Sequence, residues 1–236
     1  MLLSRGFFNL QLKFAQRMVI LTGQELPQIL LDYSYFYASF LIDREFNSEH
    51  PVWQEFLAKL EGNVNPAEVA HTFYLKRQAQ IPDSNNYFGC FYYNRLGETN
   101  IVNNHFKNRD ESGVLGRERF EVRRQELTKM YRHIRQSEPW AERIRGKTWI
   151  YNLEAYCRLF PPEYIATARP VAPEYQFLAT WGQFVEYTGE VKSAMTARFL
   201  QDLAHAHTLE EIDRCFPYQI LQTESPIDHF YEFYKI

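Results

Sequence analysis

Cysteine is scarce in this 236-residue chain. Its three cysteines, Cys90, Cys157 and Cys215, are odd in number, far apart in the sequence and without a CxxC pair. This pattern excludes an evident disulfide framework and a cysteine-rich metal site. It favours a reducing compartment, so we expect a cytoplasmic protein.

Long apolar runs and the common catalytic motifs are also missing. No apolar run approaches the ~18 residues that a membrane-spanning helix needs. The sequence has no Walker A loop, no GxGxxG, GxSxG or HExxH motif, and no cluster of cysteine and histidine. We therefore predict no metal site and no membrane span, and the residues name no cofactor.

Neither sign of charge dominates the chain. The net charge is -3, which produces no overall attraction to nucleic acid or to an anionic membrane. Arginines crowd residues 117–136, but acidic residues interleave with them, so we interpret this segment as a solvated helix and expect no nucleic-acid partner. A basic first segment precedes the first acid, Glu25, and we interpret it as a core-facing helix, with a transit peptide or a membrane-surface helix as the alternatives.

Aromatic residues, by contrast, are abundant. They make up 17% of the chain, with 19 Phe and 16 Tyr. A buried aromatic side chain removes about 150–250 Å² from water, so a ring-rich core or an aromatic-lined pocket is expected.

Hydrophobic spacing changes along the chain. The first third has helical periodicity, with Gly23 closing one helix and Pro27 and Pro51 opening others. Residues 87–93 and 100–107 predict a β-hairpin, and later segments mix both periods. We predict an α+β fold, in which an N-terminal helical layer packs with a mostly antiparallel sheet and further helices. A single domain spans 1–236, with 1–81 as a helical subdomain and 86–236 as the sheet-containing part.

Three shorter segments in the second half receive specific predictions. Residues 139–145 are expected to form a short helix, residues 148–151 a strand, and residues 177–187 a strand rich in aromatic and β-branched side chains. A strand near 218–223 and a terminal helix complete the prediction.

Polar residues are crowded among large apolar ones in the segment KTWIYNLEAYCRLFPPEYIATARP, residues 147–170. A buried charge is costly unless it is paired or has a task, so this is the first candidate site. Glu154 is the acid/base candidate, with Arg158 and Arg169 as anion contacts and Asn152 and Tyr156 as further substrate-binding groups. His105 shares one face of the predicted hairpin with Asn103 and Lys107, and it is the second catalytic candidate.

We therefore expect a small polar or anionic molecule to bind in an aromatic-lined pocket, with group transfer as the reaction class. Structural locking of an aromatic-rich turn explains the same residues equally well. A second hypothesis is a non-catalytic protein-interaction module, in which Phe230, Tyr231, Phe233 and Tyr234 anchor a protein partner. Substrate and reaction stay open at this point.

Two segments resemble acetyl-CoA-dependent N-acyltransferases. Residues 218–236, YQILQTESPIDHFYEFYKI, are similar to the late strand and following helix of that superfamily, and residues 143–148, RIRGKT, are similar to half of its R-x-x-G-x-G/A pyrophosphate loop. The resemblance implies an acyltransferase with Tyr231 as general acid. Thr148 departs from the small residue of the pattern.

Overall fold

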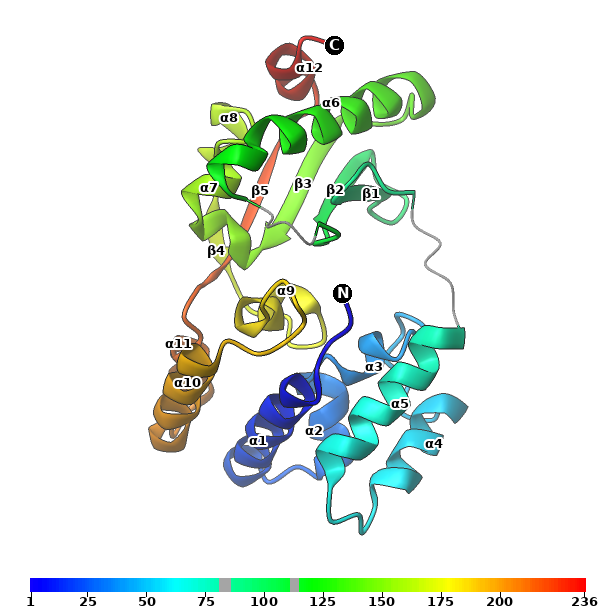
Figure 1. Cartoon of the computed structure of the whole chain (residues 1–236), viewed down its shortest axis with the longest axis vertical. Helices are drawn as coiled ribbons and strands as arrows, with labels where there is room; N and C mark the ends of the chain where they lie inside the picture. The colour runs from blue at the N-terminus through cyan, green and yellow to red at the C-terminus, as the bar shows by residue number, and fades with distance from the viewer. Residues whose placement is uncertain (81–85, 111–114) are drawn as a thin grey trace. The chain divides into compact units, whose positions relative to one another are not determined.

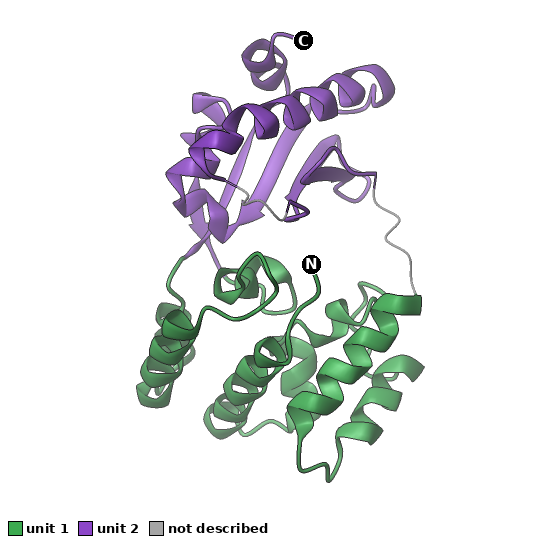
Figure 2. Cartoon of the chain, in the orientation of Figure 1, with its two compact units in different colours: residues 1–83, 173–218 green, residues 84–172, 219–236 purple. Residues whose placement is uncertain are grey.

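The structure is a computed structural model that describes residues 1–80, 86–110 and 115–236. The chain has an α+β fold, as predicted, and it divides into two compact units (Figure 2). Unit 1 comprises residues 1–83 and 173–218, and unit 2 comprises residues 84–172 and 219–236. The predicted boundary between residues 81 and 86 lies outside the described residues. Cooperative folding of 1–236 as one domain stays a prediction.

Unit 1 is helical. Its elements are α1 (Arg5–Thr22), α2 (Leu26–Tyr33), α3 (Phe36–Ser39), α4 (Pro51–Leu60), α5 (Pro66–Gln80), α9 (Leu178–Trp181), the 3-10 helix η3 (Gly182–Phe184), α10 (Ser193–His205) and α11 (Leu209–Cys215). Gly23 ends α1 in the left-handed region, with φ of +70°, as the sequence predicts.

Aromatic packing draws residues 173–218 into unit 1 rather than into the sheet-containing part. The ring of Phe14 on α1 lies 5.0 Å from the ring of Trp181 and 6.1 Å from that of Phe199. All three side chains are buried. These contacts are non-local, and they place residues 173–218 with the helices of unit 1.

Unit 2 is built around a five-stranded mixed sheet with the order β1-β2-β3-β5-β4 (Figure 1). Its strands are β1 (Phe91–Arg95), β2 (Ile101–Phe106), β3 (Arg143–Thr148), β4 (Arg169–Val171) and β5 (Ile220–Pro226). β2 and β3 pair in parallel, whereas the other three pairings are antiparallel. The sheet is therefore mostly antiparallel, as predicted, and β1 and β2 form the expected hairpin.

Helices cover one face of this sheet. They are α6 (Phe120–Ser137), which η1 (Arg117–Arg119) precedes, and α7 (Glu154–Cys157), α8 (Pro162–Ile165) and α12 (Asp228–Tyr234), with η2 (Trp149–Asn152) between β3 and α7. Tyr131, Tyr164 and Phe230 from three of these helices share one buried core with Val102 and Ile144 of the sheet.

Three secondary-structure predictions were wrong. Residues 143–145 belong to β3 rather than to a short helix, because Arg143 and Arg145 alternate with buried Ile144 and pair with strands on both sides. Residues 149–152 form η2, not a strand, and Thr148 Oγ1 accepts a hydrogen bond from Ile150 N.

The third error concerns residues 177–187. This segment forms α9 and η3 because Trp181 and Phe184, three residues apart, are both buried in the core of unit 1. Helical spacing thus overrides the β propensity of its aromatic residues. Among the described residues, no helix combines the length and apolar character that crossing a bilayer requires.

Candidate functional site

The face of the sheet opposite the helices of unit 2 is polar. Pairing places Asn94 opposite Asn103, Asn103 opposite Arg145, and Arg145 opposite Glu224, so four polar residues form a row across four strands. Side chains directly opposite each other in neighbouring strands point to the same face. Ile144, Gly146 and Thr223, which alternate with these residues in β3 and β5, are buried on the other face.

Glu224 joins two arginines on this polar face. Arg143 Nε donates a hydrogen bond of 2.7 Å to Glu224 Oε1, and Arg145 Nε donates one of 2.7 Å to Oε2. Partial burial raises the pKa of Glu224, but the hydrogen bonds and charges of Arg143 and Arg145 outweigh it, so the pKa lies below its ordinary value. The carboxylate is therefore ionised at neutral pH and holds both guanidinium groups in place.

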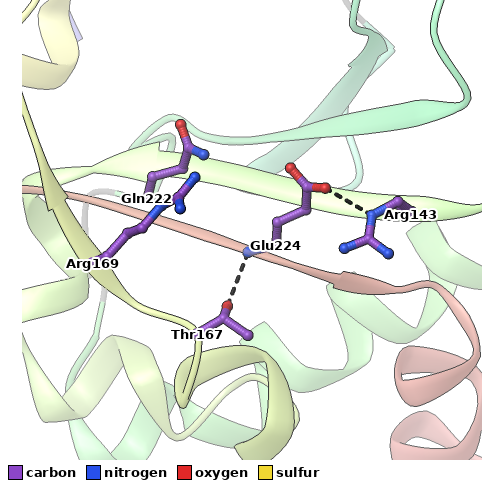
Figure 3. A pocket seen from close by; sticks show the side chains of 5 residues that line it. All are labelled: Arg143, Thr167, Arg169, Gln222 and Glu224. Atoms are coloured by element: carbon purple, nitrogen blue, oxygen red, sulfur yellow. Dashed lines mark hydrogen bonds and ion pairs between the residues drawn. The ribbon is translucent and has the colours of Figure 1, made fainter.

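A cavity of about 220 Å³ opens beside Glu224. Figure 3 shows Arg169 and Gln222 on one side of Glu224 and Arg143 on the other. Its lining is Arg143, Thr167, Arg169, Gln222 and Glu224. Arg169 and Gln222 are direct partners between β4 and β5, so the strand pairing itself brings them together. The lining is polar, in contrast to the aromatic pocket expected from the sequence.

Thr167 fixes the edge of the cavity. Its hydroxyl donates to the Tyr164 carbonyl oxygen at 2.7 Å and accepts from the Glu224 backbone N–H at 3.0 Å. The hydroxyl therefore links the segment before β4 to the middle of β5. This bond orients the strand from which Glu224 projects.

Arg169 differs from Arg143 in its partners. Among the described residues, no carboxylate or carbonyl group pairs with the Arg169 side chain, which is exposed, whereas Arg143 is engaged by Glu224. A guanidinium group presents several N–H donors in a planar fork that matches carboxylate and phosphate oxygens. Arg169 is thus a cation available to an external anion.

Asn152 is used internally. Its side-chain Nδ2 donates to the carbonyl oxygens of Trp149, at 2.6 Å, and Gln219, at 2.9 Å. Both N–H donors of that amide are therefore occupied in joining η2 to the start of β5. This arrangement matches the structural-locking alternative for Asn152.

Glu154 and Arg158 lie four residues apart, but within the described part of the chain they form no ion pair. The Arg158 backbone N–H donates to the Glu154 carbonyl oxygen at 3.0 Å, so the backbone spacing between them is helical. Arg158 instead donates to the Leu115 carbonyl oxygen at 3.3 Å, and its guanidinium lies 5.2 Å from the centre of the Phe120 ring. Glu154 is exposed.

Tyr156 and His105 lie on opposite faces of the sheet. Tyr156 is 2% exposed and packs against Phe106, and burial raises its pKa well above the ordinary value. His105 stacks on Tyr92 with ring centres 4.6 Å apart, and its Nε2 contacts Asn103 Nδ2 at 3.1 Å and Asn94 Oδ1. Of the six candidate residues, Arg169 lines the cavity, while Asn152, Glu154, Tyr156, Arg158 and His105 are not among its lining.

The sequence-based candidates missed Arg143, Thr167, Gln222 and Glu224. Charged residues alternate with small or apolar ones over 143–147, and polar residues stand two apart at 222 and 224. Both patterns indicate strands with one polar face. The alternation over 143–147 was not recognised, because residues 139–145 were predicted to form a helix. Across the described ranges, no group of three or more His, Cys, Asp or Glu gathers in a way that could hold a metal ion.

The structure also shows where the residues of the protein-interaction and acyltransferase hypotheses lie. Phe230 and Tyr234 are buried in the core of unit 2, so neither is an exposed anchor for a partner. Residues 143–148 form a strand rather than a loop leading into a helix, so they do not build the pyrophosphate loop that the resemblance implies. Tyr231 lies in α12, and its ring centre is 5.1 Å from the Arg135 guanidinium.

Comparison with known proteins adds no relative. No protein-family model, curated protein or solved structure matches this chain.

Proposed function

We propose that unit 2 binds a small anionic molecule on the polar face of its sheet, with Arg169 and Arg143 as the contacts to the anion. The observation that supports this proposal most strongly is Arg169. Its guanidinium lines the cavity beside Gln222, and among the described residues no carboxylate forms an ion pair with it. Charge-assisted hydrogen bonds from arginine to an anion are stronger than neutral ones.

The rest of the lining favours a recognition site over a simple surface charge. Glu224 holds Arg143, and Thr167 holds the Glu224 backbone, so the cavity is shaped before a ligand arrives. A preformed arrangement lowers the conformational entropy lost on binding. Two further predictions from the sequence stay predictions: that Glu154 acts as acid or base in a group-transfer reaction, and that the protein is cytoplasmic.

The test is an NMR titration of arginine Nε–Hε signals with acetate and with inorganic phosphate at constant ionic strength. The Arg169 signal is expected to shift in a saturable way, with a millimolar dissociation constant. Arg169→Gln is expected to weaken binding at least tenfold. Arg198→Gln is the matched control, because the Arg198 side chain is 85% exposed and lies in unit 1. Linear, unsaturable shifts with both anions would eliminate the proposal.

Acetyl-CoA-dependent acyl transfer is the second candidate, and the β2/β3 pair is the observation in its favour. The parallel pairing ends at Asn103 and Arg145, although β2 continues to Phe106 and β3 to Thr148. Both amide atoms of Asn104 are buried at this point without a hydrogen-bond partner. Ligands of α/β proteins gather at the carboxyl ends of parallel strands, where an extended amide chain finds backbone partners.

Calorimetry separates the two candidates. If acyl transfer is the function, acetyl-CoA binds to the wild-type protein and to Arg169→Gln with similar affinity, because Arg169 lies on β4, which β5 separates from β3. Absence of any binding heat with acetyl-CoA at micromolar protein would remove this candidate. The anion proposal would be unaffected by that result.

A further inference from the structure

The charges around the cavity define the class of anion more narrowly. We propose that the ligand is a small phosphate monoester bound as its dianion, an inference that rests on the proposed function. Arg143, Arg169 and Glu224 line the cavity, and Arg145 pairs with Glu224 from the same face, so the cluster of these four groups carries a net charge of +2. Lys147, which is paired with Gln222 across β3 and β5, is a further basic residue on this face. A dianion neutralises the cluster, whereas a monocarboxylate leaves one positive charge uncompensated.

The way in which Glu224 is bound leaves donors for such a ligand. Arg143 and Arg145 both reach Glu224 through Nε. Among the described residues, the terminal nitrogens of these two guanidinium groups have no hydrogen-bond partner. Each arginine therefore retains N–H donors after it has paired with Glu224. Three arginine forks can supply more donors than a carboxylate can accept, which suits the three terminal oxygens of a phosphate monoester.

The neutral residues of the lining fit the ester part of the ligand. Gln222 projects beside Arg169 (Figure 3), and among the described residues its side-chain amide has no partner. An amide both donates and accepts hydrogen bonds, so it can contact a hydroxyl or an ester oxygen. The volume of about 220 Å³ is smaller than that of pockets for drug-sized ligands, which begin near 300 Å³. A phosphate ester of a few carbon atoms is therefore the expected size.

Two tetrahedral anions of the same shape test the charge argument directly. Methyl phosphate is a dianion at pH 8, since its second pKa is about 6, whereas methyl sulfate is a monoanion at every pH used. The titration follows the arginine Nε–Hε signals of the full chain at constant ionic strength. Methyl phosphate is expected to bind at least tenfold more tightly than methyl sulfate at pH 8, and the two affinities are expected to converge at pH 5.

A variant tests whether the charge of Arg145 contributes to the preference for methyl phosphate over methyl sulfate. Arg145→Gln lowers the net charge of the cluster to +1, so it is expected to reduce the preference for methyl phosphate at least threefold while methyl sulfate binding changes less. Circular dichroism and the melting temperature report whether this variant is folded. Glu224 stays ionised between pH 5 and 8, because its pKa lies below the ordinary value. His105 lies elsewhere on the same face, so a His105→Gln variant is titrated in parallel as a control.

The possible results distinguish specific binding of a phosphate dianion from binding of anions in general. Equal affinity for the two anions at pH 8 would overturn the dianion and leave anion binding in place. Saturable binding of acetate without binding of methyl phosphate would do the same. Failure of all three anions to bind would overturn both the phosphate ester and the proposed function.

Discussion

Arg145 and Glu224 face each other directly across β3 and β5, and Arg145 Nε lies 2.7 Å from Glu224 Oε2. Arg143, two residues earlier on the same face of β3, occupies the other carboxylate oxygen. The cluster is thus held by strand register rather than by a loop. A one-residue slip of β5 would turn Glu224 into the apolar core, so the geometry of the site and the fold of unit 2 depend on the same pairing.

Glu224→Gln is expected to lower stability at neutral pH and to have no effect in acid. The pKa of Glu224 is lowered in the folded state, so its contribution is present above the pKa of unfolded glutamate, about 4.3, and is lost as the pH falls through the folded value. Because the cluster is partly exposed, the expected loss is about 1 kcal/mol or less at pH 7.

Urea denaturation at pH 7, 5 and 3 measures this difference. Glu163→Gln is the control, because Glu163 is exposed on α8 of the same unit. A deficit of Glu224→Gln that stays the same at pH 7 and pH 3 would show that the carboxylate charge is not the cause.

Gly146→Ala is expected to destabilise unit 2 by about 1–3 kcal/mol through overpacking. A methyl group at Gly146 would lie 2.0 Å from the Tyr151 hydroxyl oxygen and 2.5 Å from that of Tyr164. These hydroxyls bond to each other at 2.7 Å, so neither can move away without losing that bond. Chemical denaturation of the single variants and of Gly146→Ala/Tyr151→Phe gives the coupling energy. Additive effects of the two substitutions would contradict the predicted clash.

Gly189→Ala is expected to be more damaging than Gly23→Ala. Both glycines have positive φ, +94° and +70°, and both substitutions therefore bring strain of about 1–2 kcal/mol. At Gly189 the added carbon would also lie 1.8 Å from the Leu2 carbonyl oxygen, whereas at Gly23 no atom lies within 4 Å.

Hydrogen exchange localises the expected damage. The Ser4 backbone N–H donates to the Gly189 carbonyl oxygen at 3.0 Å, so Gly189→Ala should accelerate exchange at Ser4 while Gly23→Ala should not. If both variants lose the same stability and exchange at Ser4 is unchanged, the close approach to the Leu2 carbonyl oxygen does not contribute to the loss.

Arg123→Met is expected to cost about 3–5 kcal/mol. Arg123 is 2% exposed and pairs with Asp110 at 2.8 Å and with Glu126 at 3.2 Å. Burial raises the pKa of Glu126, and the Cys90 backbone N–H and Arg123 both oppose that rise, so removal of Arg123 leaves the buried carboxylate without its paired cation. Arg119→Met, which removes a partly exposed partner of Asp110, is expected to cost less than about 1 kcal/mol.

A double variant identifies the cause. Arg123→Met/Glu126→Gln should recover part of the stability lost in Arg123→Met, because the carboxylate that lacks its paired cation is replaced by a neutral amide. Thermal unfolding at pH 7 measures both. No recovery in the double variant would place the loss in packing around the arginine stem rather than in charge.

Local rules were sufficient for much of the fold. Gly23 ends a helix because glycine adopts a left-handed conformation at little cost, and Thr208 begins α11 because its hydroxyl accepts the Glu211 N–H at 3.2 Å. Alternation over residues 101–106 predicted β2. By contrast, the first residues of β3, 143–145, were predicted to be helical, because their conformation depends on hydrogen bonds to β2 and β5, which lie far away in the sequence.

The candidate site was less accessible to such rules. Arg169 was named from its polar character in an apolar segment, but its neighbour Gln222 and the cluster at Glu224 come from a strand that follows fifty residues later in the chain. Asn152 and Arg158 were named on the same grounds, and their side chains bond to backbone carbonyl groups instead. Sequence crowding identifies costly polar groups, but it does not distinguish those that face a cavity from those that stabilise a turn.

The amino-acid sequence alone determined the α+β class, helix ends such as those at Gly23 and Thr208, and the β-hairpin, because these depend on residues within a few positions of one another. Only the tertiary structure decided that residues 173–218 join the helical unit and that Arg143, Arg169 and Glu224 surround one cavity. Those outcomes depend on which distant aromatic rings fit together and on the register of β3, β4 and β5, and neither is encoded in a local pattern.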